Sequence, residues 1–477
     1  MNRNKKIIIL LGIFICVSLA AVGVSQYEER KEIIKNSDEI IMEVDQEDVN
    51  ALSWECDTGS FAFHKDKNGK WIYDADEAFP VDEERIKELL GQFQEFGVSF
   101  RIEEVEDFGQ YGLDAPVCTI HMETETQTYE ILLGNYSAMD SQRYVSIGDG
   151  NAYLVKEDPL SRFGTELCNL IKHDEIPRFE DVTQVCFSGA EPEKIVYEED
   201  SANTYYEEDV FFMERDETLL ALDSTRVKEY LDTVRNLNLK DYVTYNASEE
   251  ELKTYGLDAP ELSIQMDYTM AEEGSGEKIS GTFTLHIGRG PEEREKEAET
   301  EETEEGTTDM EESTKEAAAY ARVGESKIIY QITGDQFKKL MDMSYDALRH
   351  QEIFWADFTD MYQLDVLLEG ETYTITSEME DEKRTYYYKE EELEMAGIRG
   401  AVRGLTVTAF TDEQPAQKEE ISLTIYLDNE NAPEVRIQLY RYDGNKCIAV
   451  VDGNTIAFVE RAKVVDLVEA VHTIILD

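Results

Sequence analysis

The sequence lacks the short motifs on which most metal and enzyme sites are built. Its six cysteines form no CxxC pair, and its six histidines form neither an HExxH pattern nor a pair at helical ligand spacing, so no metal-ligand spacing is present. The GxSxG, Walker and dinucleotide-binding glycine patterns are also missing. We therefore predict no cofactor, no metal and no catalytic residue, and a hydrolytic enzyme is the least favoured class.

Basic residues are scarce. The chain holds 45 lysines and arginines against 105 acids, which gives a formal net charge of −60. Nucleic acid and anionic lipid headgroups would be repelled, so we predict no nucleic-acid partner. A divalent cation or a basic polymer remains open as a partner. The densest acidic stretch, residues 292–316, holds 13 acids and three bases, and we predict a disordered insertion over about 290–318.

Only one long apolar run occurs. Residues 7–24 form an uncharged stretch of 18 residues that follows three cations, Arg3, Lys5 and Lys6. That length just spans a bilayer core of roughly 30 Å, and the cations favour a cytoplasmic N-terminus. We predict a cytoplasmic tail at 1–6, a transmembrane anchor at 7–26 and an extracytoplasmic remainder. The alternative is a cleaved secretory signal, because Ser18–Ala21 offers small residues.

The cysteines outside that run are scattered. They are Cys56, Cys118, Cys168, Cys186 and Cys447. Their spacing favours small buried side chains over a disulfide framework. Cys56 and Cys186 fall in predicted opening strands, where a buried side chain is expected.

The sequence does contain internal repeats. Tyr-Gly-Leu-Asp-Ala-Pro occurs at 111–116 and again at 255–260, and His173–Ile176 resembles His350–Ile353. Gly134 and Gly288 recur at matched positions after the hexapeptides. A fainter echo links Asp149–Asn151 with Asp452–Asn454. Such self-similarity indicates one unit copied along the chain, with modules at 38–172 and 173–349 and a degenerate third module at 350–477.

Each module reads as strands interrupted by two helices. In the first, strand-like runs lie at 49–54, 60–64, 70–73, 118–122, 128–133, 143–147 and 152–155, with helices over 81–93 and 159–171. The second repeats the first helix from Ser224, a predicted N-cap. The order is βββ-α-ββββ-α, which gives an α+β class of tandem, mainly antiparallel, β-rich modules.

The hexapeptide has a structural interpretation as a turn. Ser248–Glu251 has the form of a capping box, and Gly256 lies where a left-handed residue ends a helix. Leu257 then folds back on Leu252, and Leu113 on Phe108. The alternative is that the motif binds a ligand, in which case its tyrosines and aspartates would be the contacting residues. The candidate residues are Tyr111, Gly112, Leu113, Asp114 and Pro116, with Tyr255, Gly256, Leu257, Asp258 and Pro260.

These features resemble the bacterial domain-of-unknown-function 4340 family. The resemblance rests on an N-terminal anchor, the hexapeptide, and the runs Ile131–Asn135, Arg143–Val145 and Ala152–Val155 that follow it. It covers two copies over roughly 37–349. It implies a membrane-anchored extracytoplasmic protein, often encoded beside ABC-type transporter subunits of the kind linked to gliding motility, and it implies no catalytic residue.

Two hypotheses of function follow. The first is a non-enzymatic, membrane-anchored extracytoplasmic scaffold or interaction protein, accessory to an ABC-type transporter or envelope complex, with permease and ATPase subunits as partners. The second is a cell-surface protein that binds a ligand or a divalent cation.

Overall fold

The computed structural model describes Val17 and residues 39–103, 105–189, 192–272, 276–294, 317–380 and 383–476. Within these residues no helix combines the length and the apolar character that a membrane crossing needs. The predicted anchor at 7–26 lies outside the described residues, apart from Val17. The predicted insertion at about 290–318 also lies mostly outside them.

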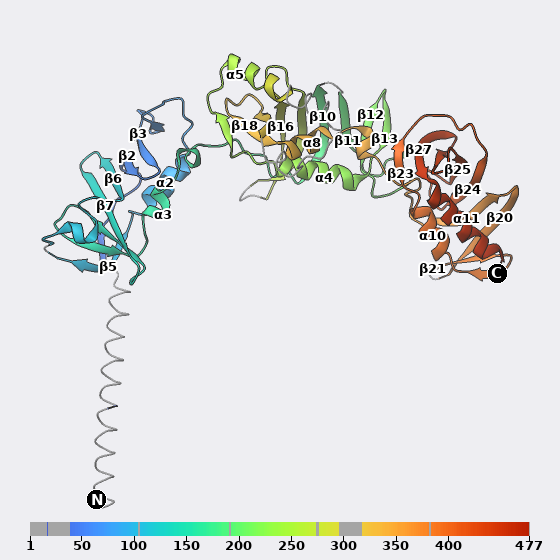
Figure 1. Cartoon of the computed structure of the whole chain (residues 1–477), viewed down its shortest axis with the longest axis horizontal. Coiled ribbons are helices and arrows are strands. Elements are labelled where there is room, and N and C mark those ends of the chain that lie inside the picture. Colours follow the sequence, from blue (N-terminus) through green and yellow to red (C-terminus); the bar gives the residue numbers. More distant parts are fainter. Residues whose placement is uncertain are drawn as a thin grey trace, which may run out of the picture. The chain divides into compact units, whose positions relative to one another are not determined.

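The first sheet has nine strands in the order β1-β5-β9-β8-β7-β6-β2-β3-β4. Figure 1 shows it with the helices α2 and α3. Its strands are β1 (Glu39–Met42), β2 (Val49–Cys56), β3 (Gly59–Lys65), β4 (Trp71–Tyr73), β5 (Phe96–Ile102), β6 (Cys118–Thr124), β7 (Thr128–Ser137), β8 (Gln142–Ser146) and β9 (Ala152–Val155). The helices are α2 (Glu83–Gly91), η1 (Phe108–Tyr111), α3 (Leu160–Phe163) and η2 (Leu167–Asn169).

The second sheet follows the order β13-β12-β11-β10-β15-β16-β17-β18-β14. Its strands are β10 (Asp181–Gly189), β11 (Glu193–Tyr197), β12 (Phe211–Arg215), β13 (Thr218–Ala221), β14 (Tyr242–Thr244), β15 (Leu262–Ala271), β16 (Lys278–Gly288), β17 (Ala317–Val323) and β18 (Ile329–Thr333). Its helices are α4 (Ser224–Arg235), α5 (Glu249–Thr254), α8 (Gly334–Met341) and α9 (Tyr345–Leu348). Helices α4 and α8 pack together, and α8 also contacts β17 and β18.

The third sheet follows the order β22-β21-β20-β19-β24-β25-β26-β27-β23. Its strands are β19 (Met361–Leu368), β20 (Glu371–Glu380), β21 (Lys383–Tyr388), β22 (Glu391–Leu393), β23 (Val407–Phe410), β24 (Glu419–Leu427), β25 (Glu434–Arg441), β26 (Lys446–Val451) and β27 (Asn454–Glu460). Helices α10 (Ala396–Arg403) and α11 (Arg461–Leu476) pack on each other, and α11 reaches β24, β26 and β27.

One strand plan serves all three sheets. A first strand (β2, β10 or β19) pairs on one side with a hairpin partner and on the other with the second strand after the first helix (β6, β15 or β24). Three further antiparallel strands then follow outward in chain order, and the strand directly after the first helix (β5, β14 or β23) pairs beyond the last of them. The prediction of β-rich, mainly antiparallel tandem modules is therefore confirmed.

The detailed order of elements differs from the prediction in three ways, and the first is β1, which precedes the first predicted strand. An additional strand, β5, follows the first helix, and β14 and β23 occupy the matching place in the other sheets. Gly97 and a register shift between Val98 and Phe100 break its alternation, which hides it from a period-two reading. The predicted helix 159–171 is two short pieces, α3 and η2, because the backbone leaves helical geometry at Gly164, which ends α3 with φ −75° and ψ 32°.

Caps and turns follow the local sequence closely. Asp82 and Asp223 cap α2 and α4 by accepting backbone N–H groups, so the predicted N-cap Ser224 is wrong by one residue. Ser224 instead accepts a hydrogen bond from the Val210 amide at 2.9 Å. A tight turn at Asp66–Gly69 joins β3 and β4, where the Asp66 carboxylate accepts the Asn68 and Lys70 amides.

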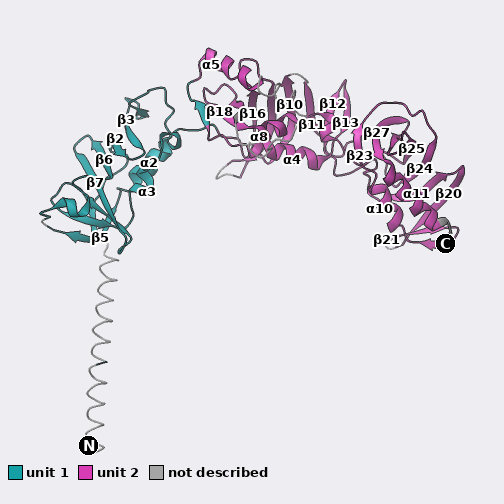
Figure 2. Cartoon of the chain, in the orientation of Figure 1, with its two compact units in different colours: residues 1–174, 242–246 teal, residues 175–241, 247–477 magenta. Residues whose placement is uncertain are grey.

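The chain divides into two compact units, shown in Figure 2. The first holds residues up to 174 together with 242–246, and the second holds residues 175–241 and 247–477. The second unit therefore contains the third sheet. In the first unit the core centres on aromatic side chains, with the ring of Trp54 5.6 Å from that of Phe63 and 5.4 Å from that of Phe163.

Candidate functional site

Both hexapeptides end a short helix and enter a central strand. In the first copy Gly112 follows η1 with φ +70°, and the Leu113 amide donates to the Phe108 carbonyl at 3.0 Å. Leu113 is buried, Asp114 is exposed and Pro116 is half-buried. The Tyr111 ring packs 4.9 Å from that of Tyr144 on β8. The motif thus directs the chain into β6.

The second copy repeats this geometry. Ser248 and Glu251 form the predicted capping box of α5, Gly256 has φ +69°, and the Leu257 amide donates to Leu252 at 2.7 Å. The Tyr255 ring lies 4.5 Å from Tyr320 on β17, the place that Tyr144 holds in the first sheet. Burial, with Glu293 beside the ring, raises the pKa of Tyr320 to about 12. Leu257 is buried, Asp258 exposed and Pro260 half-buried.

A glycine at the end of the following strand lets each turn approach. A Cβ at Gly134 would lie 2.3 Å from the Tyr111 carbonyl oxygen, and one at Gly288 would lie 2.2 Å from that of Gly256. No side chain fits at either place. The hexapeptide and the later glycine therefore form one backbone contact. A role for the tyrosines and aspartates of the hexapeptide in binding a ligand stays a hypothesis.

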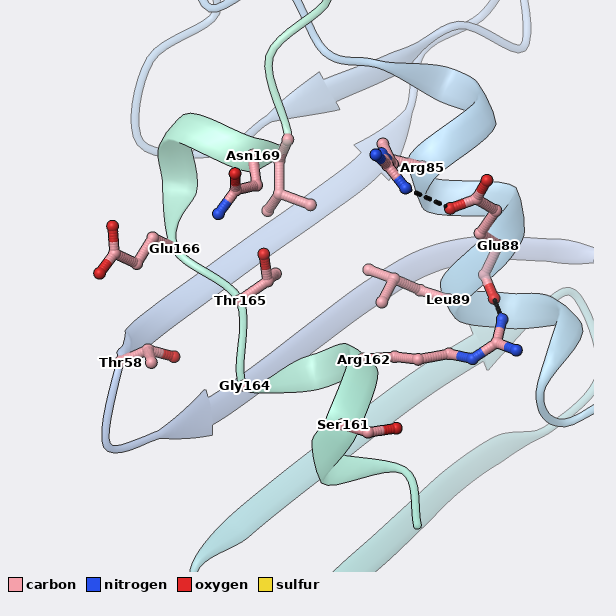
Figure 3. A pocket seen from close by; sticks show the side chains of 11 residues that line it. Thr58, Arg85, Glu88, Leu89, Ser161, Arg162, Gly164, Thr165, Glu166 and Asn169 are labelled. Carbon is pink, nitrogen blue, oxygen red and sulfur yellow. Dashed lines mark hydrogen bonds and ion pairs between the residues drawn. The ribbon is translucent and has the colours of Figure 1, made fainter. Parts of the chain in front are cut away.

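A hollow of about 930 Å³ lies on the first sheet's helical side, between α2 and the α3–η2 segment. Figure 3 shows the side chains that surround it. They are Thr58, Arg85, Glu88, Leu89, Ser161, Arg162, Gly164, Thr165, Glu166, Asn169 and Leu170. Leu89 and Leu170 are buried and form its apolar part.

Two arginines, Arg85 and Arg162, and two glutamates, Glu88 and Glu166, line the hollow, so its formal charges balance. Arg85 donates from Nη1 to Glu88 Oε2 at 2.7 Å, and Arg162 donates from Nη1 to the Glu88 carbonyl oxygen at 3.0 Å. Each guanidinium has further N–H groups that can meet an acceptor. With the hydroxyls of Ser161 and Thr165 beside them, they suit an anionic or polyhydroxyl ligand, although the chain as a whole is strongly acidic.

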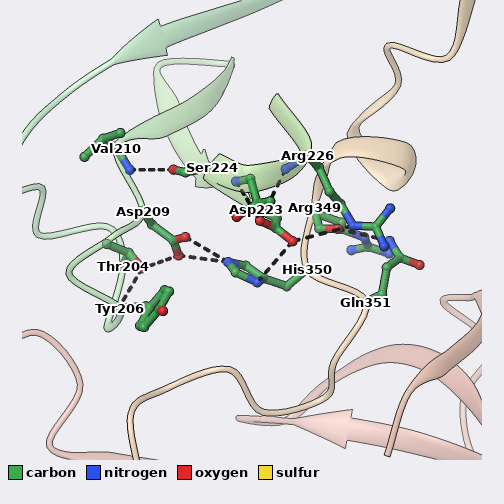
Figure 4. Close-up of polar contacts among 11 residues, drawn as sticks. Thr204, Tyr206, Asp209, Val210, Asp223, Ser224, Arg226, Arg349, His350 and Gln351 are labelled. Atoms are coloured by element: carbon green, nitrogen blue, oxygen red, sulfur yellow. Dashed lines mark hydrogen bonds and ion pairs between the residues drawn. The ribbon is translucent and has the colours of Figure 1, made fainter. Parts of the chain in front are cut away.

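The second and third sheets meet at a buried polar contact drawn in Figure 4. His350 Nε2 lies 2.9 Å and 3.0 Å from the two carboxylate oxygens of Asp209, and both side chains are buried. Thr204 Oγ1 donates to the same carboxylate at 2.9 Å. His350 Nδ1 faces Asp223 at 4.0 Å. Because buried polar groups need partners, these contacts fix one arrangement of the segments that carry Asp209 and His350.

The same contact continues into the third sheet. The β24–β25 loop donates from Asn429 Nδ2 to the Tyr205 carbonyl at 2.9 Å, and from Asn431 Nδ2 to the Ser201 and Thr204 carbonyls. The Trp355 ring stacks on both His350 and Tyr205 at 4.8 Å. Burial raises the pKa of Tyr205 well above its ordinary value. We call this set, Thr204, Tyr205, Asp209, His350, Trp355, Asn429 and Asn431, the inter-sheet joint.

The sequence pointed to only part of these sites. The sequence marked His173 and His350 as a matched pair, and both make hydrogen bonds: His173 Nε2 lies 3.2 Å from the Cys168 carbonyl oxygen, and His350 contacts Asp209. Nothing in the sequence distinguishes Asp209 from the other acids, 105 in all. Nothing marks Asn429 or Asn431 either. The structure brings none of the hexapeptide residues to the hollow or the joint. Among the described residues, no group of three or more His, Cys, Asp or Glu side chains could hold a metal ion.

The fold and these sites define a chain of tandem antiparallel β-sheet modules. Residues 71–260 match the family model described as a domain of unknown function, DUF4340. The match contains both hexapeptides and confirms the resemblance predicted from them. Comparisons with curated proteins and with solved structures find no match.

Proposed function

We propose that this chain is a non-enzymatic, membrane-anchored scaffold or interaction protein of the extracytoplasmic space, accessory to an ABC-type transporter or envelope complex. The observation that supports it best is the threefold use of one strand plan, with the second and third copies fastened by the inter-sheet joint. Repeated surfaces on one chain let weak contacts act together, because each contact after the first becomes intramolecular. The transporter part comes from the family resemblance.

Co-purification tests this proposal. The full-length chain is cross-linked in its native membrane, and its companions are identified by mass spectrometry. We expect permease and ATPase subunits to be recovered repeatedly with it. An N429A/N431A variant, which removes the side-chain donors across the joint, should recover fewer of them at equal expression. Recovery of the chain alone would contradict the scaffold role.

The hollow in the first sheet supports a second candidate function, the binding of a cell-surface ligand. Arg85 and Arg162 are the groups that can donate to an anionic polymer, whereas Glu88 and Glu166 line the same hollow and can meet a cation. Calorimetry with calcium and with anionic cell-wall polymers separates the two kinds of ligand. We expect heat with the polymer, lost in an R85A/R162A variant and kept in R101A, whose guanidinium pairs with Glu39 elsewhere in the sheet. A flat trace with every ligand would exclude this function.

A further inference from the structure

Cys56 and Cys118 lie directly opposite each other in the first sheet. Cys56 is the last residue of β2, Cys118 is the first of β6, and the two are Cα partners in the antiparallel register. Directly opposed residues in such a pair have Cα atoms about 4.5–5.5 Å apart. That separation falls inside the range of about 4.4–6.8 Å that a disulfide requires.

Both side chains also point to the same face. The two preceding pairs along these strands are Trp54 with Ile120 and Leu52 with Met122, all buried. Because side chains alternate along a strand, the cysteines continue this buried row. Cys118 is buried and Cys56 half-buried. A disulfide between them would therefore link the last pair of this buried row without rotating the backbone of either strand.

The other sheets show that thiols are not needed there for packing. The matching register pair is Gly189 with Leu262 in the second sheet and Leu368 with Ile421 in the third. Neither contains a cysteine. At this place the second sheet has an exposed glycine and a buried leucine, the third sheet has two buried aliphatic side chains, and the first sheet has two opposed thiols.

We propose that Cys56 and Cys118 form a cross-strand disulfide, made by exchange with an external disulfide or a disulfide-bearing oxidoreductase. In the first step the Cys56 thiolate attacks that disulfide, so a mixed disulfide forms and one thiol leaves. In the second step the Cys118 thiolate attacks Cys56 Sγ and the second thiol leaves. The two protein thiols lose two electrons and two protons, and the external disulfide gains both.

The surroundings set the order of these steps. Cys56 Sγ lies 3.4 Å from the Phe163 carbonyl oxygen and 3.0 Å from Thr58 Oγ1, and Thr58 and Gly164 line the hollow. A small oxidant can therefore approach Cys56. The pKa of the Cys118 thiol is raised to about 12, mainly by burial and next by the neighbouring Cys56. Because so little Cys118 thiolate is present at neutral pH, Cys118 is the poorer attacker of an external disulfide. It therefore suits the second step, inside the protein.

The test is oxidation of the purified full-length protein with oxidised glutathione, followed by alkylation under denaturing conditions and peptide mass spectrometry. We expect one linked peptide joining Cys56 to Cys118, with Cys168, Cys186 and Cys447 alkylated. C118S should retain glutathione on Cys56, whereas C56S should carry none on Cys118. C186S, the matched control, should still form the bridge. Alkylation of both Cys56 and Cys118 after oxidation, or pairing with other cysteines, would overturn the proposal.

Two further readouts make the test complete. Oxidation should raise the melting temperature of the first unit by about 5–10 °C, and C56S should show no such rise. Alkylation in intact cells shows whether Cys56 and Cys118 are bridged or reduced there. This second readout tests the extracytoplasmic location of the first unit, which rests on the proposed function. A pair that bridges in vitro but is fully reduced in cells supports the bridge and contradicts extracytoplasmic exposure.

Discussion

At the scale of single residues, the turns depend on glycines that lie outside the repeated hexapeptide. Gly134 lies on β7, well after the motif, yet its backbone touches that of the turn. A Cβ at this position would meet Leu113 side-chain carbons at 3.0 Å as well as the Tyr111 carbonyl oxygen at 2.3 Å. A backbone oxygen cannot rotate away as a flexible side chain can. The repeat of this glycine therefore has a steric cause, independent of any ligand.

Replacing Gly134 by alanine should therefore destabilise the first unit by about 1–3 kcal/mol, because the turn must move away from β7. The matched control is Gly97→Ala in β5, where an added Cβ would meet its nearest atoms only at 3.9 Å. Thermal unfolding of both variants by calorimetry measures the difference. Equal melting temperatures for the two would show that the close approach is not needed.

At the scale of elements, an ion pair clamps the ends of the β15–β16 hairpin. Glu261, just before β15, accepts from Arg289 Nη2 at 2.9 Å and lies 3.3 Å from Arg294 Nε. Burial alone would raise the pKa of Glu261, but the hydrogen bonds and charge of Arg289, with Arg294, lower it on balance. Its folded pKa is therefore below its unfolded value.

This shift predicts a pH-dependent contribution to stability. A carboxylate with a lowered folded pKa stabilises the fold above its unfolded value of about 4.3, and this is lost as pH falls through the folded pKa. Glu261→Gln should cost about 1–2 kcal/mol at pH 7, and the difference from wild type should shrink between about pH 5 and pH 3. Urea unfolding across that range measures it. Asp335→Asn, which breaks an exposed helix pair with Lys339, should change little at any pH.

The inter-sheet joint makes a second prediction at this scale. His350→Ala leaves the buried Asp209 carboxyl without its imidazole partner, which should cost about 2–4 kcal/mol. Because the joint fastens the third sheet to the second, the single calorimetric transition expected for the second unit should separate into two. His64→Ala removes an exposed His–Asp pair in the first unit and should leave that transition unchanged. A single, unshifted transition in the His350 variant would mean that the joint carries no coupling.

At the scale of the whole molecule, the sequence predicts the tandem plan but not how its parts are joined. Six identical residues mark the repeat of two modules, and short runs bounded by turn residues predict most strands of the first module almost as they occur. The strand β5 is missed because a glycine and a bulge interrupt its alternation. Asp209, Asn429 and Asn431 are missed because they act through loops distant in sequence, where no local periodicity marks a partner.

The central claim is that several modules of this chain engage a common partner complex. Each sheet exposes a large apolar side chain that can be exchanged for a photo-crosslinking residue without disturbing the core, namely Met139, Ile279 and Met379, at 87%, 42% and 52% exposure. The decisive measurement is photo-crosslinking from these three positions in intact membranes, with mass spectrometry of the adducts. The account predicts the same transporter or envelope subunits from at least two modules. Adducts with no protein, or only with further copies of this chain, would contradict it.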